Sequence, residues 1–254
     1  MNLYLPSTLD WPQRGLSVTQ STGYPTDPAG TSVLTVTGSG HLDPRLRVPY
    51  WAERGFTVRL NGVPQRVDAV PGTYVSLSRQ WRNGDRVEIA APFTLRVERA
   101  LDDPAVQGVA YGPLPLVIRS SATEYQDLTL YRDYPLDRDL SRAIRPAAEP
   151  MTFTANGLTL VPFHLDTTEA YHMYFTRAEP EIVFGDTATG VENRPGPDRR
   201  TFLDEVWDRG PFGSRGSPVR AVTEVADDRV RAGQLTARQR KVVIAAAGRA
   251  RLPG

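Results

Sequence analysis

The stretch from Arg45 to Ile89 alternates apolar and polar residues with a period of two, interrupted by turn residues. In such a strand successive side chains point to opposite faces, so alternation places the apolar ones on one face. The residues that share the apolar face are Leu46/Val48, Phe56/Val58/Leu60, Val75/Leu77 and Val87/Ile89. One apolar and one polar face is typical of an antiparallel sheet with a single solvated side. The sequence therefore predicts a mostly β fold.

Asparagine–glycine pairs mark the ends of several predicted strands. Asn61-Gly62 and Asn83-Gly84-Asp85 separate strands in this stretch, and Asn156-Gly157 lies between two later ones. These residues accept the positive φ angles that tight hairpin turns require. Each pair thus predicts a hairpin.

The predicted strands group into domains by their spacing. Eight or more short strands, separated by turns, predict an antiparallel β-sandwich over residues 1–118. A second, smaller β-sheet domain (β-sandwich II) is expected over 119–185, where a sheet of four strands would need the first sandwich to cover one of its faces. Residues 186–254 are predicted to form a loop followed by a C-terminal helical extension.

Helix signals define this extension after a loop expected over 186–200. Thr201 is expected to open a short helix, and Ser217-Pro218 has the N-cap and first-turn proline of a second one. Thr236 and Gln239 form a capping-box pair for a last helix ending near residue 247, with Gly248 beyond it. The last two helices form a hairpin whose apolar stripe must rest on a sheet or on another chain.

Composition excludes several classes of function. The chain of 254 residues has a net charge of +1 and no cysteine, so it offers no disulfide, thiolate nucleophile or sulfur-based zinc site. No long-range field favours nucleic acid, and no apolar run approaches the roughly 18 residues of a membrane span. The N-terminus lacks a signal-peptide pattern, which predicts a cytoplasmic chain as it stands, or an extracellular one if it is a fragment of a secreted enzyme.

The sequence shows no catalytic motif. His164 and His172 flank Asp166 and Glu169, but a third ligand at metal-site spacing is missing, so we expect no metal, no cofactor and structural histidines. The segment 229–251 holds seven basic residues and no acidic one. It is interpreted as a solvated helix face, with an anionic partner as the alternative.

Aromatic residues at strand ends are the candidate binding residues. Tyr50, Trp51 and Trp81 lie where predicted strands meet turns of the first sandwich. Exposed rings there would stack on the apolar face of a sugar. The alternative is that Trp51 and Trp81 fill the ends of the sandwich core, and the sequence favours this second interpretation for both.

A series of ordered motifs runs through the chain: YLPS at 4–7, GLSVTQ at 15–20, LRVPYWA at 46–52, VRLNG at 58–62, WRNGDRV at 81–87, YGPL at 111–114 and LTLVPF at 158–163. Together they resemble the region that follows the catalytic barrel in glycoside hydrolase family 127, the β-L-arabinofuranosidases and related enzymes. The likeness covers residues 3–178, and the helical tail resembles an extension of actinobacterial relatives.

The resemblance implies an (α/α)6 barrel followed by two β-sandwich domains. It places the chemistry in the barrel, where a cysteine nucleophile lies with a zinc ion held by further cysteines and a glutamate. This sequence matches only the sandwiches, so no catalytic residue is carried over. The family's first sandwich also takes a strand from the N-terminus of the full enzyme, and an unpaired sheet edge here would need a cover.

Three hypotheses follow. The first is a non-catalytic accessory module that supports or completes a catalytic barrel, whose partners would be a barrel chain or a second copy of itself. The second is an independent carbohydrate-binding protein for a plant-type glycan, using Tyr50, Trp51 and Trp81. The third, a stand-alone glycoside hydrolase, would need a carboxylate pair or the strand histidines in a cleft.

Overall fold

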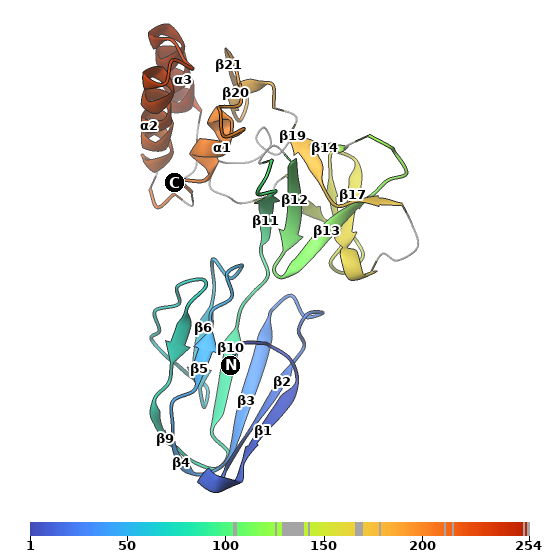
Figure 1. The fold of residues 1–254 in the computed structure, drawn as a ribbon, viewed down its shortest axis with the longest axis vertical. Helices are drawn as coiled ribbons and strands as arrows, with labels where there is room; N and C mark the ends of the chain where they lie inside the picture. Colours follow the sequence, from blue (N-terminus) through green and yellow to red (C-terminus); the bar gives the residue numbers. More distant parts are fainter. Residues whose placement is uncertain are drawn as a thin grey trace. The chain divides into compact units, whose positions relative to one another are not determined.

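The computed structural model describes most of the chain as two compact units (Figure 1). The first comprises residues 1–94 and 111–114, and the second comprises 95–110 and the residues from 115 onward. The described residues are 1–103, 106–124, 126–128, 140–141, 143–165, 170–177, 179–210, 212–214, 216–250 and 252.

The first unit is built on a six-stranded antiparallel sheet of order β1-β2-β3-β10-β6-β7. Its strands are β1 (Ser7–Trp11), β2 (Leu16–Thr22), β3 (Thr31–Gly38), β6 (Thr57–Leu60), β7 (Val63–Pro64) and β10 (Arg86–Ala90). Two further antiparallel pairs accompany the sheet, namely β4 (Gly40–Leu42) with β9 (Arg79–Trp81) and β5 (Arg45–Arg47) with β8 (Tyr74–Ser76). The sheet and the pairs form the predicted β-sandwich.

Burial in this unit follows the alternation of the sequence. On β10, Val87 and Ile89 are fully buried, while Arg86 is exposed. The neighbouring strands β3 and β6 alternate in the same way. The β5–β8 and β4–β9 pairs also contribute buried side chains, namely Leu46, Val75 and Trp81. Apolar area removed from water at about 25 cal/mol per Å² is thus the main stabilising contribution.

Two of the three predicted hairpins are confirmed. Asn61 and Gly62 have φ angles of 50° and 78°, and the flanking residues Leu60 and Val63 pair directly. Asn156 and Gly157 repeat this arrangement in the second unit, with φ angles of 50° and 76°. Both are two-residue hairpins with positive φ at the two central positions. Asn83-Gly84 instead forms a turn between β9, which pairs with β4, and β10, which pairs with β3 and β6.

Asp85 ties two of these connections together. Its carboxylate accepts a hydrogen bond from Asn61 Nδ2 at 2.9 Å and another from the Arg82 backbone N–H at 2.9 Å. Asn61 Oδ1 in turn accepts from the Arg86 backbone N–H at 2.8 Å. Because these bonds favour the ionised carboxylate, that from Asn61 most of all, the pKa of Asp85 lies below its usual value.

The second unit contains a nine-stranded sheet whose main order is β14-β19-β12-β13-β17-β16-β15, with β11 beside β12 and β18 beside β13. All its described pairings are antiparallel except β14 with β19, which is parallel. The strands are β11 (Leu95–Arg99), β12 (Val106–Tyr111), β13 (Leu114–Arg119), β14 (Gln126–Leu128), β15 (Arg145–Pro146), β16 (Phe153–Ala155), β17 (Leu158–Pro162), β18 (Tyr171–His172) and β19 (Phe175–Arg177).

The division between units lies near Thr94 and differs from the expected domain boundary at residue 118. Local alternation places strands β11, β12 and β13 in the first sandwich, but they pair in the second sheet. Val117 of β13 faces Val161 of β17, and Gln107 of β12 faces Phe175 of β19. These partners are 44 to 68 residues away in the sequence, so local periodicity does not reveal them.

The region expected to be a loop over 186–200 begins as a strand. Strands β20 (Glu181–Phe184) and β21 (Thr187–Glu192) form a hairpin around Gly185, whose φ is 56°. The expectation of a loop was wrong for this part because Gly190, with a φ of 68°, lies within a strand instead of interrupting it.

Three helices follow: α1 (Phe202–Trp207), α2 (Ser217–Arg231) and α3 (Ala237–Arg249). Thr236 and Gln239 form the predicted capping box of α3. The predicted N-cap of α2 is one residue late, because Gly216 occupies that position. Gly248 lies inside α3 and not beyond it. The apolar stripe of the hairpin is accounted for, since α3 packs against β20 and β21. Among the described helices, none has the length and apolar character of a membrane crossing.

We expect the substitution D85N to destabilise the protein by about 1–3 kcal/mol at pH 7, because one buried donor loses its acceptor. The folded-state pKa of Asp85 is lowered, so its contribution is complete above the unfolded value of about 3.9 and is lost as the pH falls through the folded value. Urea unfolding should therefore show the difference between D85N and wild type at pH 7 and a smaller one at pH 3. The exposed Asp10 provides the control D10N, and an equal difference for D85N at both pH values would contradict the assignment.

Candidate functional sites

The rings at one end of the first unit form a packed aromatic cluster. Trp51 and Phe93 meet edge to face with centroids 5.4 Å apart, and Phe93 meets Tyr111 in the same way at 5.5 Å. Tyr24 stacks beside Trp51 at 6.3 Å, and Tyr4 lies 6.4 Å from Tyr24. Such pairs add stability beyond the area that they bury. Burial also raises the pKa of Tyr4 and that of Tyr111.

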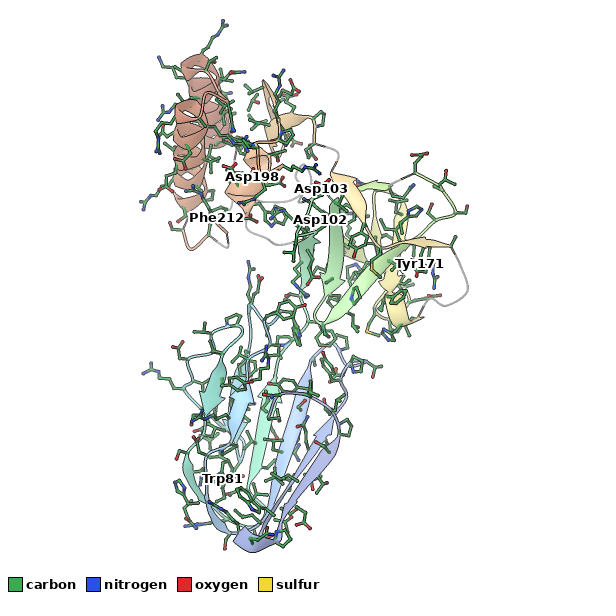
Figure 2. All side chains as sticks on the ribbon, in the orientation of Figure 1. Trp81, Asp102, Asp103, Tyr171, Asp198 and Phe212 are labelled. Atoms are coloured by element: carbon green, nitrogen blue, oxygen red, sulfur yellow. The ribbon has the colours of Figure 1, made fainter. Side chains whose placement is uncertain are left out.

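The three residues predicted to contact carbohydrate have different environments. Trp51 is 5% exposed and Trp81 is 1% exposed, whereas Tyr50 is 59% exposed. Trp81 lies inside the first unit (Figure 2), and its indole N–H donates to the Leu42 carbonyl at 3.0 Å. The burial of both tryptophans agrees with the core interpretation, which leaves Tyr50 as the accessible ring of the three. Sugar binding itself stays a prediction.

Other exposed rings were not singled out as site residues. Trp11 is 36% exposed, and the Arg14 guanidinium lies 4.7 Å from its ring centroid. In the second unit, Phe163 and Tyr171 are 39% and 42% exposed, with centroids 5.4 Å apart. Phe163 follows β17 directly, so its place after a predicted strand was the available signal.

The histidines occupy separate structural positions. His41 Nε2 lies 3.4 Å from Ser78 Oγ, and His172 Nε2 lies 2.8 Å from the Ala122 carbonyl oxygen. His164 is exposed, and Asp166 and Glu169 lie outside the described residues. Across the described ranges, no group of three or more metal-ligating side chains is assembled.

A buried polar cluster joins α1 to β11. Asp204 is fully buried and caps α1, accepting at 2.9 Å from both the backbone N–H and the hydroxyl of Thr201. Arg99 of β11 lies 3.5 Å from Asp204 and donates to Asp208 at 2.5 Å. Each carboxylate is thereby held by a cation or a helix N-terminus, which indicates a structural role.

One of the seven basic residues of segment 229–251, Arg229, does not present its charge at the surface. Its side chain is buried, and Nη2 donates to Glu205 Oε1 at 2.6 Å and to the Arg200 carbonyl at 2.7 Å. It fixes the loop before α1 to α2. Arg231 and Arg240 form ion pairs with acidic residues of α2. These pairs favour the interpretation of the segment as a solvated, internally paired helix face.

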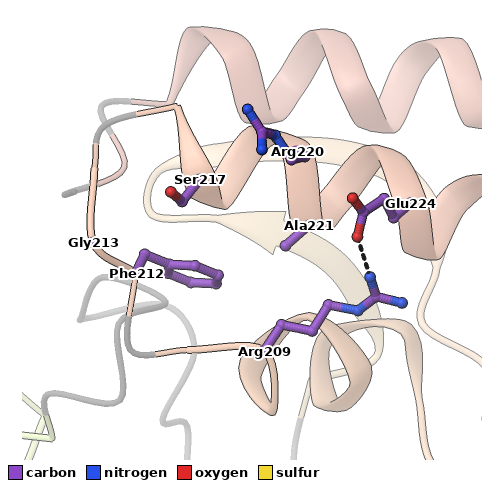
Figure 3. Close-up of a pocket in the computed structure, with 7 residues that line it drawn as sticks. All are labelled: Arg209, Phe212, Gly213, Ser217, Arg220, Ala221 and Glu224. Carbon is purple, nitrogen blue, oxygen red and sulfur yellow. Dashed lines mark hydrogen bonds and ion pairs between the residues drawn. The ribbon is translucent and has the colours of Figure 1, made fainter.

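A cavity of about 430 Å³ lies between the end of α1 and the start of α2 (Figure 3). Arg209 and Phe212 face into it, and Arg209 forms an ion pair with Glu224 across it. Ser217 contributes a hydroxyl that lies 2.8 Å from that of Ser214. None of the lining residues that the structure describes is a histidine, so these residues provide Ser217 with no imidazole base for nucleophilic chemistry.

Residues 1–93 match the family model of the middle domain of β-L-arabinofuranosidases of glycoside hydrolase family 127. This match corresponds to the first unit and confirms the resemblance there. No curated protein matches the chain.

Two solved structures show a similar fold, each at 20% identity and a TM-score of 0.51. One is a family 127 β-arabinofuranosidase and the other a family 127 β-L-arabinofuranosidase from Geobacillus stearothermophilus. The match covers 69% of this chain and 34% and 33% of those chains, respectively. This chain thus spans about a third of their length.

We expect W81A to cost about 3–5 kcal/mol, because it leaves a cavity and an unpaired carbonyl in the core. Y50A should stay within about 0.5 kcal/mol of wild type. Thermal and urea unfolding would measure both, and W81F serves as a milder variant if W81A does not fold. A Y50A loss as large as that of W81F would contradict the assignment of Tyr50 to the surface.

Proposed function

We propose that this chain is a non-catalytic accessory module of a family 127-like glycoside hydrolase, which supports or completes a catalytic barrel. The observation that carries the proposal is the match of residues 1–93 to the family's middle domain. The fold similarity extends into the second unit, since it covers 69% of the chain. Most of each similar structure lies outside the matched region.

The chemistry of the sequence supports the same proposal. The resemblance places a cysteine nucleophile in the barrel, and this chain has no cysteine to supply one. Two buried ionisable groups of the second unit, Asp204 and Arg229, are engaged in capping and pairing within that unit. The module's contribution would therefore be structural, with the reacting groups on another polypeptide or segment.

The proposal predicts a stable complex with a barrel chain. Co-expression with a tagged barrel-only chain encoded beside it should give a stoichiometric complex in size-exclusion chromatography, because the barrel would otherwise expose the surface that the sandwiches cover. A barrel that keeps its own two sandwiches is the matched control and should not retain this chain. Independent elution from the barrel-only chain would contradict the proposal, and self-association in that experiment would indicate a homo-oligomer instead.

The second candidate function is that of an independent carbohydrate-binding protein. The exposure of Tyr50, at 59%, favours it, because an accessible ring can stack on a sugar face. Arabinose-containing oligosaccharides should then bind in isothermal titration calorimetry, and Y50A should weaken binding about tenfold, which corresponds to about 1.4 kcal/mol. Unchanged affinity in Y50A would exclude this residue as the contact.

A further inference from the structure

A groove of about 520 Å³ opens on the first unit along β8 and β9. This volume lies in the range of small-molecule sites, about 300–1,000 Å³. The groove combines apolar, amide, hydroxyl and guanidinium groups, and none of its described lining residues carries a carboxylate. It is lined by Leu60, Gln65, Arg66, Val67, Ser76, Leu77, Ser78, Arg79 and Gln80.

Two arginines make the groove cationic, and they differ in how far they are engaged. Arg79 lies over the Trp81 ring, 5.3 Å from its centroid, and its Nη2 is 3.9 Å from the Asp85 carboxylate. Arg66 is exposed and forms no ion pair with any described residue. Asp43 approaches the lining through a hydrogen bond from Ser76, but it also faces Arg45 at 3.7 Å. The Arg66 guanidinium therefore has N–H donors available for a ligand.

The neutral groups of the groove suit a polyhydroxylated ligand. Gln65 Nε2 donates to the Val63 carbonyl at 2.9 Å, which leaves its oxygen as an acceptor. The side-chain amide of Gln80 makes no hydrogen bond to a described residue. The Ser78 hydroxyl lies 3.4 Å from His41 Nε2. Leu60 and Leu77 are half-buried and present apolar surface beside these groups.

We propose that this groove binds a carboxylated saccharide, with Arg66 pairing with the sugar carboxylate. A guanidinium matches a carboxylate with two parallel hydrogen bonds. The two glutamine amides and Ser78 would bind ring hydroxyls, while the leucines contact the apolar face of the ring. This deepens the proposed function by naming a glycan contact, and it rests on that function only for the choice of a saccharide.

The test is calorimetric or NMR titration of the full chain with trigalacturonate, using galactotriose as the neutral counterpart. Trigalacturonate should bind saturably and at least tenfold more tightly than galactotriose. R66Q should weaken trigalacturonate binding about tenfold or more, as expected for a lost charge-assisted pair. R59Q is the matched control. Arg59 is exposed on β6, and it precedes Leu60 in the strand, so its side chain lies on the face opposite to the one from which Leu60 lines the groove.

Three results would overturn the proposal: no saturable binding of trigalacturonate, an equal loss in R59Q, or binding of inorganic phosphate as tight as that of the trisaccharide. The last would define a simple anion site. Thermal unfolding of R66Q and R59Q checks that both variants fold. Because the isolated chain is used, failure here leaves the barrel experiment unaffected.

Discussion

The central strands of the first unit are held in register by hydrogen bonds that converge on Asp85. Its carboxylate binds Asn61 and Arg82, and its backbone carbonyl accepts from Val36 at 2.9 Å. These bonds fix three segments to one another, namely the β6–β7 turn, the segment that leads into β10, and β3. A shift of one residue in any of these strands would turn the buried valines and isoleucine to solvent, so the core depends on this register.

This core determines which aromatic residues are available for binding. Trp81, on β9, donates a hydrogen bond from its indole N–H to the carbonyl of Leu42 on β4, and Trp51 packs against Phe93. Neither ring has a free face in this unit. The accessible features of the unit therefore include Tyr50, the Trp11–Arg14 pair and the arginine-lined groove beside β9. These features are compatible with an accessory module that contacts glycan.

Local patterns in the sequence were sufficient for much of the fold. Period-two alternation predicted the strands around β10, and Asn61-Gly62 and Thr236 predicted a turn and a helix start because their chemistry acts over a few residues. The boundary at residue 118 was misplaced, since the pairing of β13 with β17 is a long-range interaction that local periodicity does not encode.

The candidate site could be predicted only in part for a related reason. A tryptophan at a strand end has the same local sequence whether it is exposed or buried, so the core position favoured for Trp51 and Trp81 was established only by the neighbours that the fold places around them. The groove that contains Arg66 was not predicted, because its walls come from two connections whose approach depends on the fold. Its signal in the sequence was the cluster of arginine, glutamine and serine over residues 65–80.

The central claim is that this chain is a scaffold whose reacting groups lie elsewhere. Incubation of the purified chain with an aryl β-L-arabinofuranoside tests it most directly. If the reacting groups lie elsewhere, aryl alcohol is released no faster than in a protein-free blank. Release that rises in proportion to the concentration of this chain, and that persists through a final purification step, would contradict it.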